Sequence, residues 1–432
     1  SYLNGTPPDR TLDAHLTLFG PDHRRLFLAL AAQDTPNLGA TRAALNLSAA
    51  TLASTLDTLT REGLTTSGGR VRASTPAQQL LNAHALDTAL THLHLARHHP
   101  HDTAWPHWLA ARDLWEDHDH TPCAAAAHWH ADQELKRGYP AKAARTLEVA
   151  PQTDEVRVLR GWAMIHNQIV SDNLIHFAQC LGSCGEIILA NALLIRGESI
   201  KSEAIIKKAI SKDNFDLGNI KRIRAHLKRR EGNIKCAADL YFRSSIISLS
   251  AGDDYGYIES VSHFLSANFY LTGEIGEDVI HEASALVQGR PGLEALFYNN
   301  LANLHICRHN YGEALLCVDH ALDSAKAAES EILIAASLLN KGTILHFRGD
   351  LSLAKNYYCL ALDKCKHRSE IRLIIPILCN LSEISGRIDD LEKYRAVLIE
   401  EGHKDVVNLI DKNLEVFNHA QPNVVIGMRN AD

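Results

Sequence analysis

The stretch YNNLANLHICRHNYGEALLCVDHAL, residues 298–322, returns forty residues later as LLNKGTILHFRGDLSLAKNYYCLAL, residues 338–362. Both copies place a small residue, Ala302 or Gly342, about seven residues before a turn that contains Asn, Gly or Asp. Two helices cross closely where a small side chain lies at the crossing, so the pattern predicts antiparallel helix pairs stacked in series. The repeat carries no catalytic residue, and we expect a surface that holds another molecule rather than an active site.

The pattern extends beyond these two copies. Small anchor residues recur at spacings of 29 to 41 residues, at Ala131, Gly161, Ala190, Ala225, Ser266, Ala302, Gly342 and Ser382. Further small residues mark the second helix of the pairs, at Ala143, Ala237, Ala314 and Ala354, and one helical face later at Ala150, Ala209, Ala321 and Ala361. The periodicity predicts a mainly α protein built as a helical array.

The two best copies resemble the tetratricopeptide repeat. The matching residues are Ala302, Asn310, Tyr311, Ala314 and Ala321, followed by Gly342, Gly349, Asp350, Ala354 and Ala361. ELKRGYPAKAARTLEVA, around Gly138, is a third match. The resemblance spans residues 85 to 415 and implies a right-handed α-solenoid with a concave groove. Long helices, as in the sensor arms of bacterial regulators, would explain units of about forty residues.

In that family, the first helix of each unit lines the groove. Carried onto this sequence, the groove positions are Arg222, His226, Arg229, His263, Ala267, Tyr270, Asn299, Asn303, Ile306, Leu339, Thr343 and His346. Hydrogen-bond donors outnumber acceptors in this set. The expected partner contacts are Arg222, His226, Arg229, His263, Tyr270, Asn299, Asn303 and His346. A donor-rich groove predicts a protein, a peptide or a small anionic ligand as the partner.

Asparagine also recurs two residues before three anchors, at Asn300, Asn340 and Asn380. Asparagine is a poor helix former, so its repeated use calls for a hydrogen-bonding role. One interpretation is bonding to the backbone of a partner, and the other is a polar ladder between neighbouring helices. The sequence leaves both open.

Residues 21–78 predict a winged helix, formed by three helices and a β-hairpin. The helices correspond to PDHRRLFLALAAQ, NLGATRAALNL and SAATLASTLDTLTREGL, and TTSGGRVRAST follows with Gly68 and Gly69 at a hairpin turn. Ser48 is a natural N-cap for the third helix.

Contact of this segment with DNA is an alternative that the sequence does not favour. The third helix offers only Arg61, close to its end, and the expected wing adds Arg70 and Arg72. Binding to phosphates needs several Lys or Arg side chains, so a structural or protein-contacting role is expected instead.

A winged helix followed by helical repeats resembles the C-terminal half of STAND-class signal-transduction ATPases, including MalT-like regulators. The phrase LTREGLTTSGGRVRAST is similar to the helix-leucine-wing phrase of that class. The sequence holds no GxxxxGK[ST] loop, so the resemblance implies a fragment, or a regulator without its ATPase. We expect a non-enzymatic sensor module without a cofactor. The alternatives are a DNA-binding transcription factor that uses the winged helix directly and a tetratricopeptide scaffold or chaperone.

Composition limits the remaining choices. The chain has 432 residues and a net charge of −7, so no overall basic charge draws it to nucleic acid or to an anionic membrane. No apolar run is long enough to span a bilayer and no signal peptide is evident, so no membrane partner is expected. The nine cysteines form no CxxC pair, which predicts a reducing, cytoplasmic location. The oligomeric state is left undetermined.

Composition changes near residue 155. No Ile occurs before this point, and Lys occurs only at Lys136 and Lys142, whereas both become common afterwards. A natural fusion and an engineered chimera would both produce this seam. The domain prediction is a lead-in at 1–20, the winged helix at 21–78, first helical repeats at 79–155, a tetratricopeptide-like solenoid at 156–415 and a tail at 416–432.

A histidine-rich stretch raises the question of zinc. Its candidate ligands are His118, His120, Cys123, His128 and His130. Histidine is abundant throughout this part of the chain, including positions without ligand partners, and no HExxH pattern occurs. We therefore expect no metal site, and the absence of a GxSxG or nucleophile pattern predicts no catalytic residue.

Overall fold

The computed structural model describes residues 8–71, 74–83, 85–167, 170, 172–365, 371–386, 388–400, 407, 410–411 and 414. Across these ranges the chain forms α-helices, three short 3-10 helices and one isolated antiparallel bridge. Contacts divide the chain into two units, residues 1–130 with 149–156 and residues 131–148 with 157–432. Within the described ranges, no helix has the length and apolar character that crossing a membrane requires.

The helices follow one another along the chain with short connections. Up to residue 149 they are α1 (Pro8–Phe19), α2 (Pro21–Ala31), α3 (Leu38–Ala44), α4 (Ala49–Arg61), α5 (Ser74–Ala83), α6 (Ala85–His98), α7 (His101–Ala110), η1 (Arg112–Leu114), η2 (Asp117–Asp119), α8 (His120–Lys136) and α9 (Pro140–Val149). From residue 154 they are α10 (Asp154–His166), α11 (Asp172–Cys180), η3 (Gly182–Cys184), α12 (Glu186–Ile195), α13 (Ser199–Ile206), α14 (Asn214–Arg230), α15 (Ile234–Ser250), α16 (Asp254–Thr272), α17 (Glu277–Val287), α18 (Pro291–Cys307), α19 (Tyr311–Ala327), α20 (Glu331–Phe347), α21 (Leu351–Lys364), α22 (Ile371–Ser385) and α23 (Asp389–Glu400).

The N-terminal unit contains the three helices expected for residues 21–61. Its core includes Leu12, Phe27, Leu59 and Leu80, from α1, α2, α4 and α5. The predicted N-cap is confirmed, because the Ser48 hydroxyl accepts a hydrogen bond of 3.0 Å from the backbone N–H of Thr51.

The segment after α4 forms the expected turn but not the expected β-hairpin. Gly69 has a φ of 84°, and its N–H donates to the carbonyl of Thr66. Thr65 and Val71 form a single bridge, and no strand is present in residues 8–71. A ladder needs several paired residues on each side, and the described residues beside this turn pair at only one position. A two-stranded wing is therefore not supported; Arg72 lies outside the described residues.

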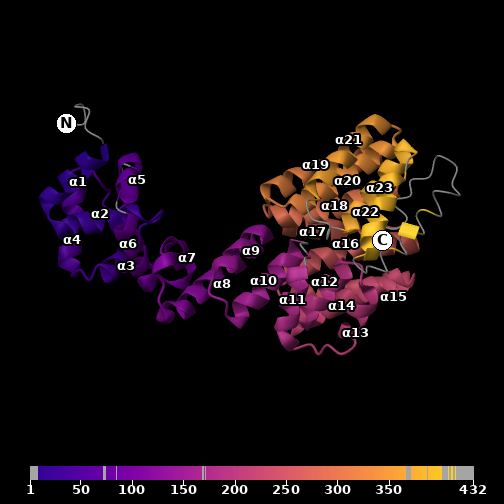
Figure 1. The fold of residues 1–432 in the computed structure, drawn as a ribbon, viewed down its shortest axis with the longest axis horizontal. Helices are drawn as coiled ribbons and strands as arrows, with labels where there is room; N and C mark the ends of the chain where they lie inside the picture. The colour runs from indigo at the N-terminus through magenta and orange to yellow at the C-terminus, as the bar shows by residue number, and fades with distance from the viewer. Residues whose placement is uncertain are drawn as a thin grey trace. The chain divides into compact units, whose positions relative to one another are not determined.

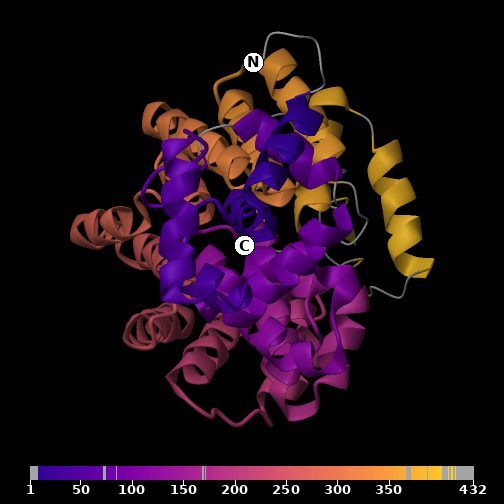
Figure 2. The same ribbon diagram turned by 90° about the vertical axis from the view of Figure 1, so that its left-hand side faces the viewer.

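The second unit is a series of packed helix pairs. Helix α14 packs on α15, α18 on α19 and α20 on α21, while the first helices α14, α16, α18 and α20 also pack on one another. Figures 1 and 2 show the pairs following one another in chain order. Separate apolar clusters lie along the series, one around Phe297 and another around Tyr358. This is the expected mainly α, tetratricopeptide-like solenoid, and its right-handed sense stays a prediction.

The predicted anchors lie at helix crossings. Gly342 is buried, and a Cβ built on it would lie 2.7 Å from Cε1 of Tyr358 on the paired helix. A Cβ on Gly161 would lie 2.8 Å from Cδ1 of Ile188 on α12. Ala302 is completely buried, whereas Ser266 is half-buried. The small residues recur because larger side chains would push the helices apart.

Within the second unit, the segment 136–148 contacts helices that come about 150 residues later in the chain. The backbone N–H of Gly292 donates to the carbonyl of Gly138 at 2.9 Å, and Nε of Arg290 donates to the carbonyl of Lys136 at 2.6 Å. A Cβ on Gly292 would lie 2.3 Å from the Gly138 oxygen, so the close approach requires glycine.

The end of α10 makes further contacts of the same kind. The Tyr255 hydroxyl donates to the carbonyl of His166 at 2.6 Å, and the Ser330 hydroxyl donates to Oδ1 of Asn167 at 3.1 Å. Arg145 on α9 forms an ion pair with Glu329 at 2.9 Å. We call these contacts, together with Gly138–Gly292, the closure of the second unit, because early helices return onto α16, α18 and α20.

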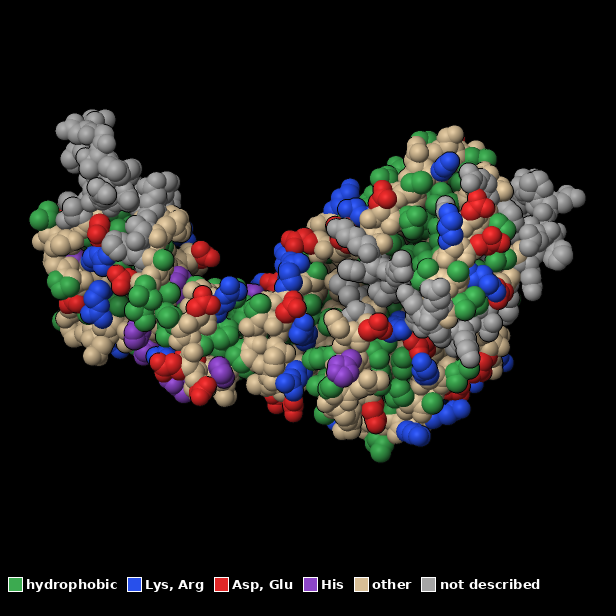
Figure 3. All heavy atoms as spheres, viewed as in Figure 1, with side chains coloured by type: hydrophobic (Ala, Val, Ile, Leu, Met, Phe, Trp, Pro, Cys, Tyr) green, Lys and Arg blue, Asp and Glu red, His purple; other side chains and the backbone are tan. Residues whose placement is uncertain are grey.

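Charged side chains of both signs are interspersed on the surface. On the face drawn in Figure 3, Lys and Arg lie beside Asp and Glu, and histidines gather along the lower margin of the N-terminal unit. The drawn face therefore carries charges of mixed sign rather than one broad charged field.

Candidate functional site: a polar cluster on α14 and α16

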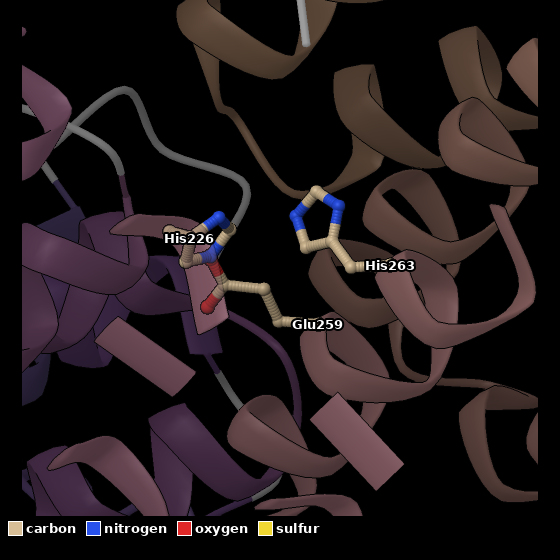
Figure 4. A group of neighbouring side chains, drawn as sticks. All are labelled: His226, Glu259 and His263. Atoms are coloured by element: carbon tan, nitrogen blue, oxygen red, sulfur yellow. The ribbon is translucent and has the colours of Figure 1, made fainter. Parts of the chain in front are cut away.

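A polar cluster forms where the first helices of two consecutive units pack side by side. Helix α14 contributes Arg222, His226 and Arg229 at spacings of four and three residues, which place them on one helix face. Helix α16 contributes Glu259 and His263, one turn apart. Figure 4 shows the two imidazoles and the Glu259 carboxylate pointing toward one another.

Arg222 lies in the interior and not on the predicted groove wall. Its side chain is 1% exposed, and its Nε lies 3.1 Å from Oε2 of Glu259. The guanidinium also donates to Oδ1 of Asn219. The prediction of Arg222 as a surface contact is therefore wrong, because the carboxylate of the next unit draws the guanidinium inward and compensates its charge.

The backbone position that faces the Arg222 guanidinium requires a glycine. A Cβ on Gly256 would lie 2.1 Å from Oδ2 of Asp253 and 2.5 Å from Nη1 of Arg222. Asp253 is buried, and burial raises the pKa of its carboxyl although the nearby Arg222 opposes that rise. Gly256 thus leaves room for two polar groups that a side chain would displace.

The histidines of the cluster have oriented rings. The Tyr241 hydroxyl lies 2.8 Å from Nδ1 of His226, and Nε2 of the same ring lies 3.7 Å from Oε1 of Glu259. Arg229 donates from Nη1 to Nδ1 of His263 at 3.2 Å. The ring centroids of His226 and His263 are 4.7 Å apart, and the two ring planes are nearly perpendicular. Apart from Tyr241, these side chains are partly exposed.

Glu259 is the anion at the centre of the cluster. Burial opposes its ionisation, but Arg222, His226 and His263 outweigh burial, and the pKa of its carboxyl lies below the usual range. Glu259 is therefore ionised at neutral pH. It balances the charge of Arg222, whose side chain is more deeply buried than that of Arg229.

His166 of α10 lies close to the same charges. Its ring stacks on Tyr255 with centroids 4.0 Å apart. Burial, followed by the charge of Arg222, lowers the pKa of His166 to about 3, so its ring is neutral. The buried, neutral ring of His166 therefore adds no charge beside Arg222 and Glu259.

The remaining predicted groove residues lie outside the cluster. Tyr270 is 77% exposed near the end of α16, whereas Asn303 and His346 are partly exposed on α18 and α20. Asn299 is buried, and Asn340 donates to its Oδ1 at 3.0 Å. For Asn340 the structure favours the polar ladder between neighbouring helices, because its amide donates to the preceding first helix, α18.

The arginines considered for DNA contact are also placed. Arg61 is exposed and forms an ion pair of 2.8 Å with Asp57 on the same helix, and Arg70 is exposed beside the turn.

Among the described residues, one group of three or more His, Cys, Asp or Glu side chains has ligand atoms within 4.8 Å of one another. It consists of His226, Glu259 and His263. In the histidine-rich stretch, Cys123 is buried, and burial raises the pKa of its thiol to about 12.

Glu259 and Tyr241 were not identified from the sequence. Glu259 lies four residues before His263 and therefore on the same face of α16, which is a signal that spacing alone could have given. Tyr241 lies on a second helix, where the family pattern assigns no groove position, and only the packing of α15 against α14 brings it to His226.

No family model and no curated protein matches the chain. Among solved structures, the chain is similar to a Signal Transduction ATPase with Numerous Domains (STAND) protein with a tetratricopeptide repeat sensor from Pyrococcus horikoshii. The identity is 14% and the TM-score 0.40, and the match covers 96% of this chain and 65% of that one. The chain therefore spans less than two thirds of the length of this structural relative.

Proposed function

We propose that this chain is a non-enzymatic sensor module of a signal-transduction protein, and that its helical array binds a protein, peptide or small molecule through an anionic group. The observation that carries the proposal is the partly exposed cluster of Arg229, His226 and His263 on consecutive first helices. In the repeat family that the sequence resembles, these helices line the ligand-binding groove. The nine free cysteines support a reducing compartment such as the cytoplasm.

The charges favour an anionic ligand. Glu259 compensates the buried Arg222, and Arg229 adds a second, more exposed guanidinium beside two imidazoles. A guanidinium with adjacent donors binds carboxylate or phosphate groups by charge-assisted hydrogen bonds. Because Arg222 is enclosed, the ligand contact is assigned to Arg229, His226 and His263.

Titration calorimetry at low salt tests this proposal with two probes, a hexaglutamate peptide and inorganic phosphate. We expect one of them to bind, with an affinity that falls as salt rises. Arg229→Glu should weaken that binding at least tenfold, whereas Lys235→Glu, an equal charge change at an exposed site on α15, should alter it less than twofold. Failure of both probes to bind, or equal losses in the two variants, would contradict the proposal.

We infer that the N-terminal α2–α4 segment and the turn after α4 contact a protein rather than DNA. The pairing of Arg61 with Asp57 supports this, since it reduces the charge available to phosphates. Salt-dependent binding of duplex DNA by the full chain would instead favour the transcription-factor alternative.

A further inference from the structure

We infer that His226, Glu259 and His263 form a binding site for a divalent transition metal, with Zn²⁺ as the ion that fits the donor set. Two imidazoles and a carboxylate are ligands that zinc accepts, and their ligand atoms lie within 4.8 Å of one another. The site goes beyond the proposed function and does not depend on it.

The distance between two of the ligand atoms is close to that around a bound ion. Ligand atoms about 2.0–2.1 Å from a tetrahedral zinc lie roughly 3.4 Å apart. Nε2 of His226 and Oε1 of Glu259 are 3.7 Å apart, so these two need only a small adjustment. His263 comes from the same helix as Glu259 and faces both groups (Figure 4), so a rotation of its side chain completes the set.

Two of the three ligands are held from behind by other side chains. Tyr241 hydrogen-bonds Nδ1 of His226, which directs Nε2 toward Glu259. Arg222 binds Oε2 of Glu259, which leaves Oε1 as the oxygen on the side of the imidazoles. Partners of this kind fix the orientation of metal ligands and contribute to the affinity of the site. A carboxylate and an imidazole arranged in this way are oriented before an ion arrives.

Arg229 competes with the ion for His263. A guanidinium only donates hydrogen bonds, so Nδ1 of His263 accepts from Arg229, and Nε2 carries the proton of the neutral ring. An imidazole that binds a metal ion through Nε2 carries its single ring proton on Nδ1. In that tautomer Nδ1 can no longer accept a hydrogen bond from Arg229. The positive charge of Arg229 also repels the ion. Removal of this guanidinium should therefore strengthen metal binding.

The donor set also excludes the common hard cations. Calcium and magnesium prefer six or more oxygen ligands, and this site offers one carboxylate. Imidazole nitrogen suits Zn²⁺, Cu²⁺, Co²⁺ and Ni²⁺. Three protein ligands leave a fourth position, and the partial exposure of the cluster gives solvent access to it.

The test uses the full chain after treatment with a chelator, titrated with Zn²⁺ in a calorimeter. Because the chain carries 25 histidines, the readout is the difference between variants rather than total zinc uptake. We expect His263→Ala to lower the affinity of the strongest site at least tenfold and Tyr241→Phe to lower it by roughly 10- to 100-fold. Arg229→Gln should raise it, and His281→Ala, at an exposed position on α17, should leave it unchanged. Mg²⁺ should give no signal.

A spectroscopic arm does not depend on substitution of a metal ligand. Co²⁺ added to the wild-type chain should produce the visible absorption of a tetrahedral nitrogen and oxygen site, and Arg229→Gln should produce it at lower Co²⁺ concentration. Identical isotherms for the wild type, His263→Ala and Arg229→Gln would overturn the inference and leave the cluster a purely structural network. The proposed anion site responds in the opposite direction, because loss of the Arg229 charge weakens anion binding. The two proposals can therefore fail independently.

Discussion

At the scale of single residues, small side chains set the distance between paired helices. Gly342 is buried against Tyr358, which is itself completely buried and hydrogen-bonded to Thr343. Gly312 also lies inside a helix, but it is exposed, and a Cβ there would meet only the side-chain oxygen of Asn310 at 3.9 Å. The two glycines therefore separate the effect of packing from that of helix propensity.

We predict that Gly342→Leu lowers the free energy of unfolding by about 1–3 kcal/mol, because the new side chain overpacks the helix crossing. Gly312→Leu should be neutral or stabilising, since leucine is the better helix former. Urea unfolding followed by circular dichroism measures both. A Gly342→Leu variant that unfolds like the wild type would mean that the crossing lies elsewhere.

The residue scale also shows where prediction from sequence ends. The helical spacing of Arg222, His226 and Arg229 correctly places them on one face of α14. It cannot tell that this face is partly interior, because the burial of Arg222 depends on Glu259 from the following unit. The groove positions came from a family pattern, and a family pattern carries no information on which neighbouring carboxylate compensates a given arginine.

At the scale of elements, α6 and α7 are joined through histidines. Nδ1 of His92 lies 2.8 Å from Nδ1 of His107, and the rings of His99 and His107 meet edge to face at 4.8 Å. Burial lowers the pKa of His107 to about 3, and it also lowers the pKa values of His92 and His99. Burial between the two helices therefore favours the neutral form of these imidazoles.

This packing predicts acid sensitivity of the N-terminal unit. The pKa of His107 is lower in the folded chain than the 6.5 of the unfolded chain, so the unfolded state binds more protons between pH 6.5 and about 3. The contribution of neutral His107 to the free energy of unfolding is therefore complete above pH 6.5. It decreases as the pH falls below 6.5, by up to about 1.4 kcal/mol per pH unit for this one group. His107→Phe should flatten this slope, while exposed His101→Gln should not.

Urea unfolding at pH 7.5, 6.5 and 5.5 measures the slope, with tryptophan fluorescence as the probe. Four of the five tryptophans lie in the N-terminal unit, at Trp105, Trp108, Trp115 and Trp129. Equal slopes in His107→Phe and the wild type would show that the proton uptake belongs to other groups.

The element scale was the most predictable from sequence. Periodicity and capping identified α2, α3, α4 and the helix pairs, because both depend on residues close together in the chain. The turn at Gly69 was also correct. The prediction of a β-hairpin is not supported, because only Thr65 and Val71 pair among the described residues. A turn depends on a few consecutive residues, whereas a strand ladder also needs hydrogen bonds between two separate runs, which the local sequence does not determine.

At the scale of the second unit, the closure joins segments that no local pattern connects. Gly138 and Gly292 are separated by more than a hundred and fifty residues, yet their backbones share a hydrogen bond. The sequence predicted a serial array in which each unit contacts its neighbours, and it gave no signal for the return of α9 and α10 onto α18 and α20. Only the accumulated curvature of all the intervening pairs brings them together.

We predict that Gly292→Ala opens this contact, because the added Cβ would lie 2.3 Å from a backbone oxygen that cannot rotate away. Amide hydrogen exchange should accelerate in residues 131–148, while the α20–α21 pair stays protected. Gly312→Ala is the matched control and should leave exchange in that segment unchanged. Slow exchange in both variants would indicate that the ion pair of Arg145 with Glu329 maintains the closure without the glycines.

The closure also limits how this array can evolve. An open solenoid can gain or lose a unit at almost any position, because each unit depends only on the next. Here, deletion of one unit between residues 138 and 292 would shift Gly292 by a whole helix pair and leave Gly138 facing the wrong surface. The count of units inside this loop is therefore fixed, and lineages of this protein should vary in length only after Ser330 or before Ala131.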